Sequence, residues 1–90
     1  MKIVISGIGE MGSHLARMLS GNGHDITVID VDTKALNELG NLADLITVEG
    51  DTTAFAVLRR AGVRRCDLFI AVRSVENDNI LSAVMAKQLG

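Results

Sequence analysis

Three glycines at a fixed spacing are the residues of this 90-residue sequence with the clearest potential for chemistry. Gly7, Gly9 and Gly12 form the pattern Gly-x-Gly-x-x-Gly between an apolar run at 3–5 and a segment with helical spacing. In that context Gly7 permits a tight turn, Gly9 lets a ligand approach the backbone, and Gly12 lets the helix pack against the strand. The free amides of residues 9–12 then favour an anionic group such as a pyrophosphate.

An acidic residue supplies the second half of this pattern. Asp30 ends an apolar run roughly 20 residues beyond Gly12, the spacing expected of a ribose-binding acid. Its carboxylate can accept hydrogen bonds from the ribose hydroxyls and would repel a 2′-phosphate, which favours NAD over NADP. The alternative is that Asp30 only forms a turn and Asp32 only caps a helix. Glu10 would weaken phosphate binding if it faced the ligand, so we expect it to point outward from the first helical turn.

Further polar residues follow the third and fourth apolar runs. Asp51 and Thr52 can offer oxygen atoms to the start of the next helix, and the same residues can contact an adenine ring. Arg73 can reach ligand phosphates as a charged donor, although a solvated loop arginine is equally compatible with the sequence. Ser74 follows it at the same edge.

The elements that must position these residues alternate along the whole chain. Strict alternation of short apolar runs and helical patterns predicts an α/β fold: a Rossmann-like, doubly wound parallel sheet of four strand–helix units in the order 3-2-1-4. The expected strands are 3–5, 26–29, 45–48 and 68–72. The expected helices run from 11 until Gly21 and Gly23, from Asp32 or Thr33 to Gly40, and through 55–61 to Gly62. A last helix is expected to form part of the core through one apolar stripe, which consists of Ile80, Leu81, Val84, Met85 and Leu89.

We interpret residues 1–90 as a single domain. The order 3-2-1-4 leaves the fourth strand at an edge, where its apolar run 68–72 would be poorly protected. We therefore expect an N-terminal fragment of a longer subunit, truncated after four units, or a partner that covers this edge.

Composition excludes several other classes of protein. A net charge of −2 disfavours nucleic acid as a partner, and the one basic cluster, at 59–65, falls where a helix should end and its dipole attracts cations. No apolar segment approaches the length that spans a bilayer, so direct membrane insertion is not expected. Cys66, His14 and His24 form no metal-ligand or catalytic set, and we predict neither a metal site nor catalytic residues. The lone cysteine is expected to be a small buried hydrophobe.

The sequence resembles the TrkA N-terminal domain, also called the RCK or KTN domain, of potassium uptake systems. The similar segments are 1–9 (MKIVISGIG), 25–32 (DITVIDVD), 50–52 (GDT), 57–63 (VLRRAGV) and 69–72 (FIAV). The resemblance implies a cytoplasmic, nucleotide-sensing regulatory subunit and no enzyme activity. It also implies a homo-oligomer held at the inner face of the cell membrane by a membrane-embedded potassium transporter subunit. NAD(H) is the first ligand it implies, with ATP/ADP or AMP as alternatives.

The resemblance extends to the binding residues, with two departures. The family commonly has Ala-Val-Thr and then Asp-Glu-x-Asn, where this chain has Arg73 in place of the threonine and Asn79 as the one clear match to the second motif. The ligand preference is therefore open. The predicted binding residues are Gly7, Ile8, Gly9, Glu10, Met11, Gly12, Asp30, Val31, Asp51, Thr52, Arg73 and Ser74.

A second hypothesis is the cofactor-binding fragment of an NAD-dependent dehydrogenase. The sheet edge offers no candidate proton donor, which favours the regulatory hypothesis, and the family resemblance decides between them. Hydride transfer by the full-length protein would identify the dehydrogenase.

Overall fold

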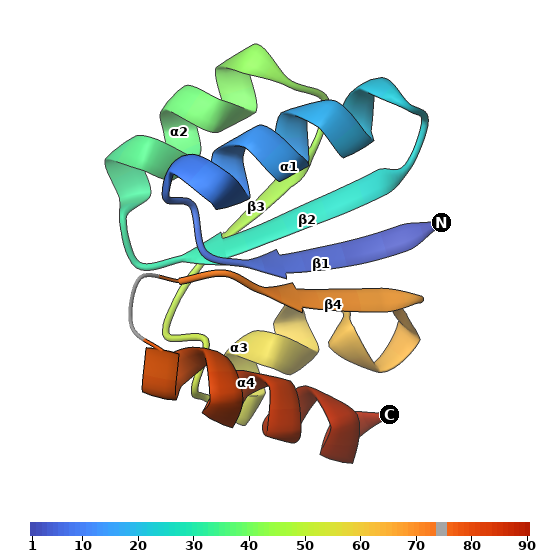
Figure 1. Ribbon diagram of the computed structural model, residues 1–90, viewed down its shortest axis with the longest axis vertical. Helices are drawn as coiled ribbons and strands as arrows, with labels where there is room; N and C mark the ends of the chain where they lie inside the picture. The colour runs from blue at the N-terminus through green and yellow to red at the C-terminus, as the bar shows by residue number, and fades with distance from the viewer. Residues whose placement is uncertain (74–75) are drawn as a thin grey trace.

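The sheet is parallel and four-stranded. The computed structural model describes residues 1–73 and 76–90, and its strands lie in the order β3-β2-β1-β4 (Figure 1), which confirms the expected fold class and strand order. Ser6 pairs with Ile29 on one side and Ala71 on the other, so β2, β1 and β4 end at the same edge. The strands are β1 (Lys2–Ser6), β2 (Asp25–Asp30), β3 (Ile46–Glu49) and β4 (Leu68–Ala71).

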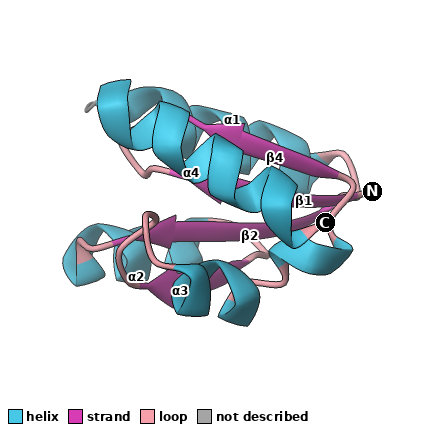
Figure 2. Ribbon diagram, turned by 90° about the horizontal axis from the view of Figure 1, so that it is seen from below, coloured by secondary structure: helices cyan, strands magenta, loops and turns pink. Residues whose placement is uncertain are grey.

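Helices cover both faces of the sheet. Figures 1 and 2 show two helices on one face and the remaining helical segments on the other, as right-handed crossovers between parallel strands produce. The first face carries α1 (Glu10–Gly21) and α2 (Thr33–Leu42). The second carries α3 (Phe55–Arg60), the 3-10 turn η1 (Val63–Arg65) and α4 (Glu76–Leu89).

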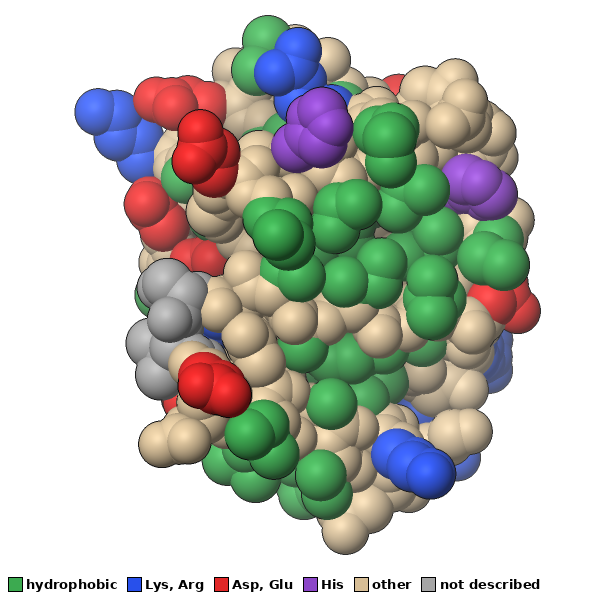
Figure 3. Space-filling model, viewed as in Figure 1, with side chains coloured by type: hydrophobic (Ala, Val, Ile, Leu, Met, Phe, Trp, Pro, Cys, Tyr) green, Lys and Arg blue, Asp and Glu red, His purple; other side chains and the backbone are tan. Residues whose placement is uncertain are grey.

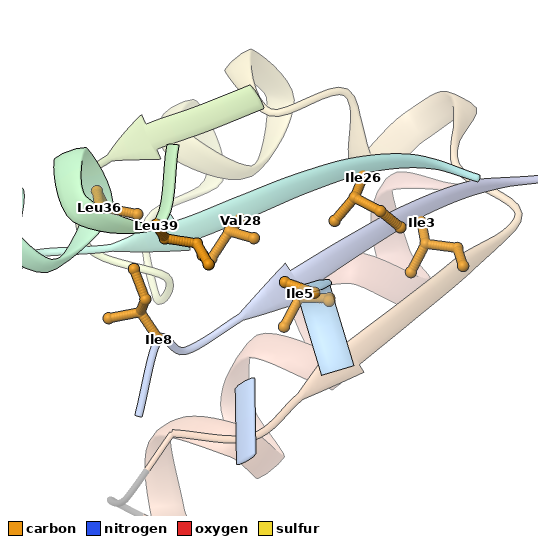
Figure 4. Close-up of a cluster of buried hydrophobic side chains, with 8 residues drawn as sticks. Ile3, Ile5, Ile8, Ile26, Val28, Leu36 and Leu39 are labelled. Atoms are coloured by element: carbon orange, nitrogen blue, oxygen red, sulfur yellow. The ribbon is translucent and has the colours of Figure 1, made fainter. Parts of the chain in front are cut away.

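Alternation along β1 divides the interior into two aliphatic clusters. Ile3 and Ile5 point to the face of α1 and α2, where they pack with Ile26 and Val28 of the neighbouring strand (Figure 4). Val4 points to the opposite face and packs in the cluster of α3 and α4. Successive side chains of a strand point to opposite faces, so one buried strand supplies both cores.

The start of α2 confirms one of the two expected caps. Asp32 is the N-cap, and its Oδ1 accepts a hydrogen bond of 3.1 Å from the amide of Ala35. The expected end at Gly40 was wrong, because the helix continues to Leu42. Gly40 does not adopt the positive φ of a terminating glycine. The amide of Ala43 instead bonds the carbonyl of Leu39 and closes the last turn.

Two other glycines end helices as expected. α1 ends at Gly21, and Gly62 follows α3 with a φ of +83°. The 3-10 turn η1, between Gly62 and β4, was not expected from the sequence. Strand limits differ by one residue, since β3 begins at Ile46 and β4 ends at Ala71.

The last helix buries a different face from the one expected. Of the apolar stripe, Met85 is buried, but Ile80, Leu81 and Val84 are about half exposed. Small residues allow close packing on the sheet, and the buried face therefore contains Ser82 and Ala86 beside Met85. The expectation that the whole stripe enters the core was wrong.

Apolar surface extends beyond α4. Leu68 in the edge strand β4 is 44% exposed, and Met11 and Met18 of α1 are also exposed. Figure 3 shows hydrophobic side chains across this face, from α1 past β4 to α4. The fourth strand thus lies at the edge with apolar side chains in contact with solvent. Among the described residues, no helix has both the length and the apolar character needed to span a membrane.

Candidate functional site

The glycine turn joins β1 to α1, and two of its glycines are required by the surrounding backbone. Gly7 has a φ of +120°, and a Cβ there would lie 2.8 Å from the amide nitrogen of Arg73. A Cβ on Gly12 would lie 2.0 Å from the carbonyl oxygen of Gly7. These contacts confirm the tight turn at Gly7 and the close helix–strand packing at Gly12.

Gly9 differs from both. It is the N-cap of α1 with a φ of −58°. Apart from its own chain neighbours, no heavy atom of the described residues lies within 4 Å of a Cβ built on it. Nothing in the described protein therefore requires a glycine at this position. The first amides of a helix have no intrahelical acceptor, so the surface beside Gly9 presents unpaired donors in open space. Such a surface suits the close approach of an anion.

The residues that follow Gly9 begin α1. Glu10 and Met11 are both exposed. The hydroxyl of Ser13 donates to the carbonyl of Ile8 at 2.9 Å and fixes the turn from the helix side.

Asp30 connects the glycine turn to the end of β2. The residue is 8% exposed, and its Oδ2 accepts a hydrogen bond of 3.0 Å from the amide of Ile8. Oδ1 accepts another of 3.0 Å from the amide of Asp32. Each carboxylate oxygen has further acceptor capacity, so ribose hydroxyls can still be bound. The sequence indicated Asp30 as a ribose acid, but this bond to the turn was not foreseen.

The loop after β3 is built around Asp51. Its Oδ1 accepts hydrogen bonds from the amide of Thr53 at 2.8 Å and from the hydroxyl of Thr53 at 2.6 Å. These bonds lower the pKa of Asp51 below its ordinary value. The expected helix cap by Asp51 or Thr52 was wrong, because α3 begins after Ala54 without a side-chain cap. Asp51 accepts hydrogen bonds within its own loop, and α3 begins only at Phe55.

The other predicted binding residues differ in how exposed they are at the ligand-facing edge of the sheet. Val31, next to Asp30, is 53% exposed. Thr52 is 1% exposed, and its hydroxyl has no hydrogen-bond partner within the described part of the chain. Its side chain therefore lies in the interior, whereas Asp51 is exposed. Ser74 lies outside the described residues.

Arg73 is not a free loop arginine. Its Nη1 lies 2.7 Å from Oδ2 of Asp78, and the two side chains are 19% and 33% exposed. Asn79 holds the backbone of Arg73 on both sides, accepting from its amide at 2.7 Å and donating to its carbonyl at 2.7 Å. The end of β4 is thus fixed to the first turn of α4.

The remaining reactive or charged residues lie elsewhere. Burial raises the pKa of the Cys66 thiol, which opposes reactivity, and the side chain packs beside the core cluster of α3 and α4. Arg60 donates to the carbonyl of Glu49. No group of three His, Cys, Asp or Glu side chains within residues 1–73 and 76–90 is placed to hold a metal ion.

One hollow is distant from the glycine turn. It measures about 630 Å³ and lies between the C-terminal ends of α1 and α2, where His14 and Leu42 line it. The glycine turn itself lies on the open edge of the sheet. We place the candidate site at this edge because it carries the unpaired amides and the buried carboxylate, which a hollow of ordinary surface residues lacks.

A parallel sheet in the order 3-2-1-4, with a glycine turn after β1 and an acid at the end of β2, defines a Rossmann-like fold. The chain belongs to the TrkA-N domain family, whose profile matches residues 3–90.

Curated relatives carry the same family name. The chain is 41% identical over 90 residues to a Trk system potassium uptake protein TrkA homolog of Archaeoglobus fulgidus, covering 100% of this chain and 20% of the relative. It is 35% identical over 89 residues to the homolog of Pyrococcus abyssi, covering 99% of this chain and 39% of the relative. The chain thus spans well under half the length of these relatives.

A solved structure has the same fold. The Kef CTD of Shewanella denitrificans in its AMP-bound form superposes with a TM-score of 0.83 at 19% identity. The match covers 98% of this chain and 52% of that one.

Proposed function

We propose that the chain is the nucleotide-sensing domain of a regulatory subunit in a Trk-type potassium uptake system. It binds NAD(H) or an adenine nucleotide and thereby controls ion transport, without catalysing a reaction. The observation that carries the proposal is the hydrogen bond from the amide of Ile8 to the buried carboxylate of Asp30, beside the open space at Gly9. It brings a ribose acceptor and a phosphate turn together at one edge.

Each part of an adenosine ligand has a matching group in the chain. The carboxylate of Asp30 would accept hydrogen bonds from the ribose, with Val31 beside it. The amides of residues 9–12 would donate to the phosphates, aided by the positive end of the α1 dipole. Asp51 would lie near the adenine. A carboxylate at position 30 repels a 2′-phosphate, so NADPH would bind more weakly than NADH.

The relatives support the wider biological role. Their names place them in potassium uptake, and the structural neighbour is an AMP-bound form. By this proposal the partner is a membrane-embedded potassium transporter subunit, and the domain acts from the cytoplasmic side as part of a homo-oligomer. Residues 1–90 form one domain of a longer subunit, which agrees with the small share of each relative that the chain spans.

A sensor must bind its ligands with unequal strength in two conformations, because equal binding shifts no equilibrium. The two states differ in how the subunits and the transporter pack, and the ligand at the sheet edge favours one of them. Oxidised and reduced NAD, or ATP and ADP, would therefore bind with different affinities.

Calorimetric titration of the chain with NADH, NADPH, ATP and ADP tests the proposal. We expect saturable binding that is weaker for NADPH and weakened by Asp30→Asn. Asp25→Asn is the matched control, because Asp25 lies at the opposite end of β2 and is exposed. Loss of binding in both variants, or no binding to the wild-type chain, would contradict the proposal. Hydride transfer by the full-length subunit would instead identify a dehydrogenase.

A further inference from the structure

The end of β4 lies directly against the glycine turn. Ser6 pairs with Ala71, and the amide of Val72 donates to the carbonyl of Ser6 at 2.8 Å. The next residue, Arg73, comes so close that a Cβ on Gly7 would lie 2.8 Å from its amide nitrogen. Arg73 is therefore a neighbour of the turn across the edge of the sheet.

The strand order sets the direction in which a ligand can extend. Asp30 ends β2, the glycine turn ends β1, and Arg73 follows β4, and these three strands are adjacent in that order. If the ribose lies at Asp30 and the first phosphate at the turn, the remainder of the ligand extends toward the end of β4. Its distal group would then meet Arg73. This step rests on the proposed function.

The backbone of Arg73 is fixed, whereas its guanidinium retains binding capacity. Both backbone groups of Arg73 are hydrogen-bonded to Asn79 at 2.7 Å, so the chain itself holds the backbone at this position. The guanidinium has five N–H donors, and the described structure pairs Nη1 with Asp78. Hydrogen bonds from Thr53 chiefly lower the pKa of Asp51, and the positive charge of Arg73 adds a smaller effect in the same direction, so this charge acts along the edge of the sheet.

The groups at the distal ends of the two kinds of ligand, adenine nucleotides and NAD, differ in charge. ADP and ATP end in phosphates, which match the planar fork of a guanidinium and form short, charge-assisted hydrogen bonds with it. NAD ends in a nicotinamide nucleoside, which has no terminal phosphate and in its oxidised form carries a positive ring. A cation at the end of β4 attracts the first group and repels the second.

We propose that Arg73 is a specificity-determining residue that selects adenine nucleotides ending in a β- or γ-phosphate over the dinucleotide NAD. Asp78 competes with the ligand for the guanidinium, because the ion pair at 2.7 Å must loosen when a phosphate takes its place. Asp78 therefore weakens binding of the phosphate-ended ligand.

Calorimetric titration with ATP, AMP and NAD⁺ tests this assignment, because AMP reaches the turn and has no distal phosphate. The wild-type chain should bind ATP roughly tenfold or more tightly than NAD⁺, the effect of one charge-assisted hydrogen bond. Arg73→Gln should lower the affinity for ATP by about tenfold and the affinity for AMP by less than about threefold. Arg17→Gln removes the same charge from an exposed position on α1 and should change neither.

The acidic partner gives a test in the opposite direction. Asp78→Asn should tighten ATP binding by a few fold, while Glu76→Gln, an equal charge change in the same turn of α4, should have a smaller effect.

An unchanged ratio of ATP to AMP affinity in Arg73→Gln would overturn the assignment and leave the proposed function standing. If no nucleotide bound the wild-type chain, the proposed function would fail, and this inference would fail with it.

Discussion

The carboxylate of Asp30, at the end of β2, accepts a hydrogen bond of 3.0 Å from the amide of Ile8 in the glycine turn after β1. The same side chain also accepts from the amide of Asp32 at 3.0 Å. One buried carboxylate therefore shapes the glycine turn after β1 and the start of α2. A residue with the right chemistry for a ribose is also part of the scaffold that positions the phosphate turn.

Replacing Asp30 should reduce both stability and ligand affinity. Asp30→Ala leaves the buried amide of Ile8 and the part-buried amide of Asp32 without their acceptor, so the free energy of unfolding should fall by roughly 1–3 kcal/mol. Asp30→Asn keeps one oxygen acceptor and should lose less stability while still weakening ribose binding. Urea unfolding measures the first effect and calorimetry the second. Equal stability of Asp30→Ala and the wild type would show that the bond to Ile8 is unimportant.

Alanine substitution at two glycines of the turn should affect different properties: stability at Gly12 and ligand affinity at Gly9. Gly12→Ala places a Cβ 2.0 Å from the carbonyl oxygen of Gly7, and such overpacking should cost about 1–3 kcal/mol or more. Gly9→Ala meets open space and should cost less than about 1 kcal/mol, the difference between glycine and alanine at an N-cap. Its methyl group would block the approach of a phosphate, so binding should be lost from a folded chain. Retention of full affinity in Gly9→Ala would place the phosphate elsewhere.

The sequence was most informative where a local pattern determines the structure. Alternating apolar runs predicted the sheet and its order, and the spacing of Gly7 and Gly12 predicted a turn that the backbone contacts confirm. The bond from Ile8 to Asp30 could not be predicted, because it depends on how two strand ends align in space. The same reason applies to Arg73, whose ion pair forms with the following helix.

The local sequence pattern also could not predict which face of α4 is buried. A helical stripe shows which apolar residues share a face, but the strand that receives the helix decides which face is covered. Here small side chains at Ser82 and Ala86 allow close contact with the sheet, and the larger Ile80 and Val84 remain exposed.

This arrangement predicts a contrast within α4. Met85 is 7% exposed and packs in the cluster with Val4 and Leu58, so Met85→Ala should lower the free energy of unfolding by roughly 2–5 kcal/mol. Ile80 is 59% exposed, so Ile80→Ala should change it by no more than about 0.5 kcal/mol. Urea unfolding of dilute chain gives both values. A large loss in Ile80→Ala would show that its side chain is buried in solution.

Cys66 should react slowly with alkylating reagents. Burial raises the pKa of its thiol, and the thiolate is the form that reacts. The rate of reaction with iodoacetamide should therefore rise with pH around a midpoint above about 8.5, the ordinary value for cysteine. The chain unfolded in guanidinium chloride is the control and should show the ordinary midpoint. Because Cys66 is the one cysteine of the sequence, mass spectrometry of the alkylated chain reports this site alone.

The same shift makes stability depend on pH in a defined direction. The folded chain holds the thiol proton more tightly than the unfolded chain, so the contribution of Cys66 to stability is fully present below the ordinary pKa. It declines as the pH rises through the raised value. The free energy of unfolding should therefore fall in alkaline solution above about pH 8.5, and Cys66→Ser should remove that part of the slope. A folded chain that reacts as fast as the unfolded one at every pH would show that the thiol is exposed and the shift absent.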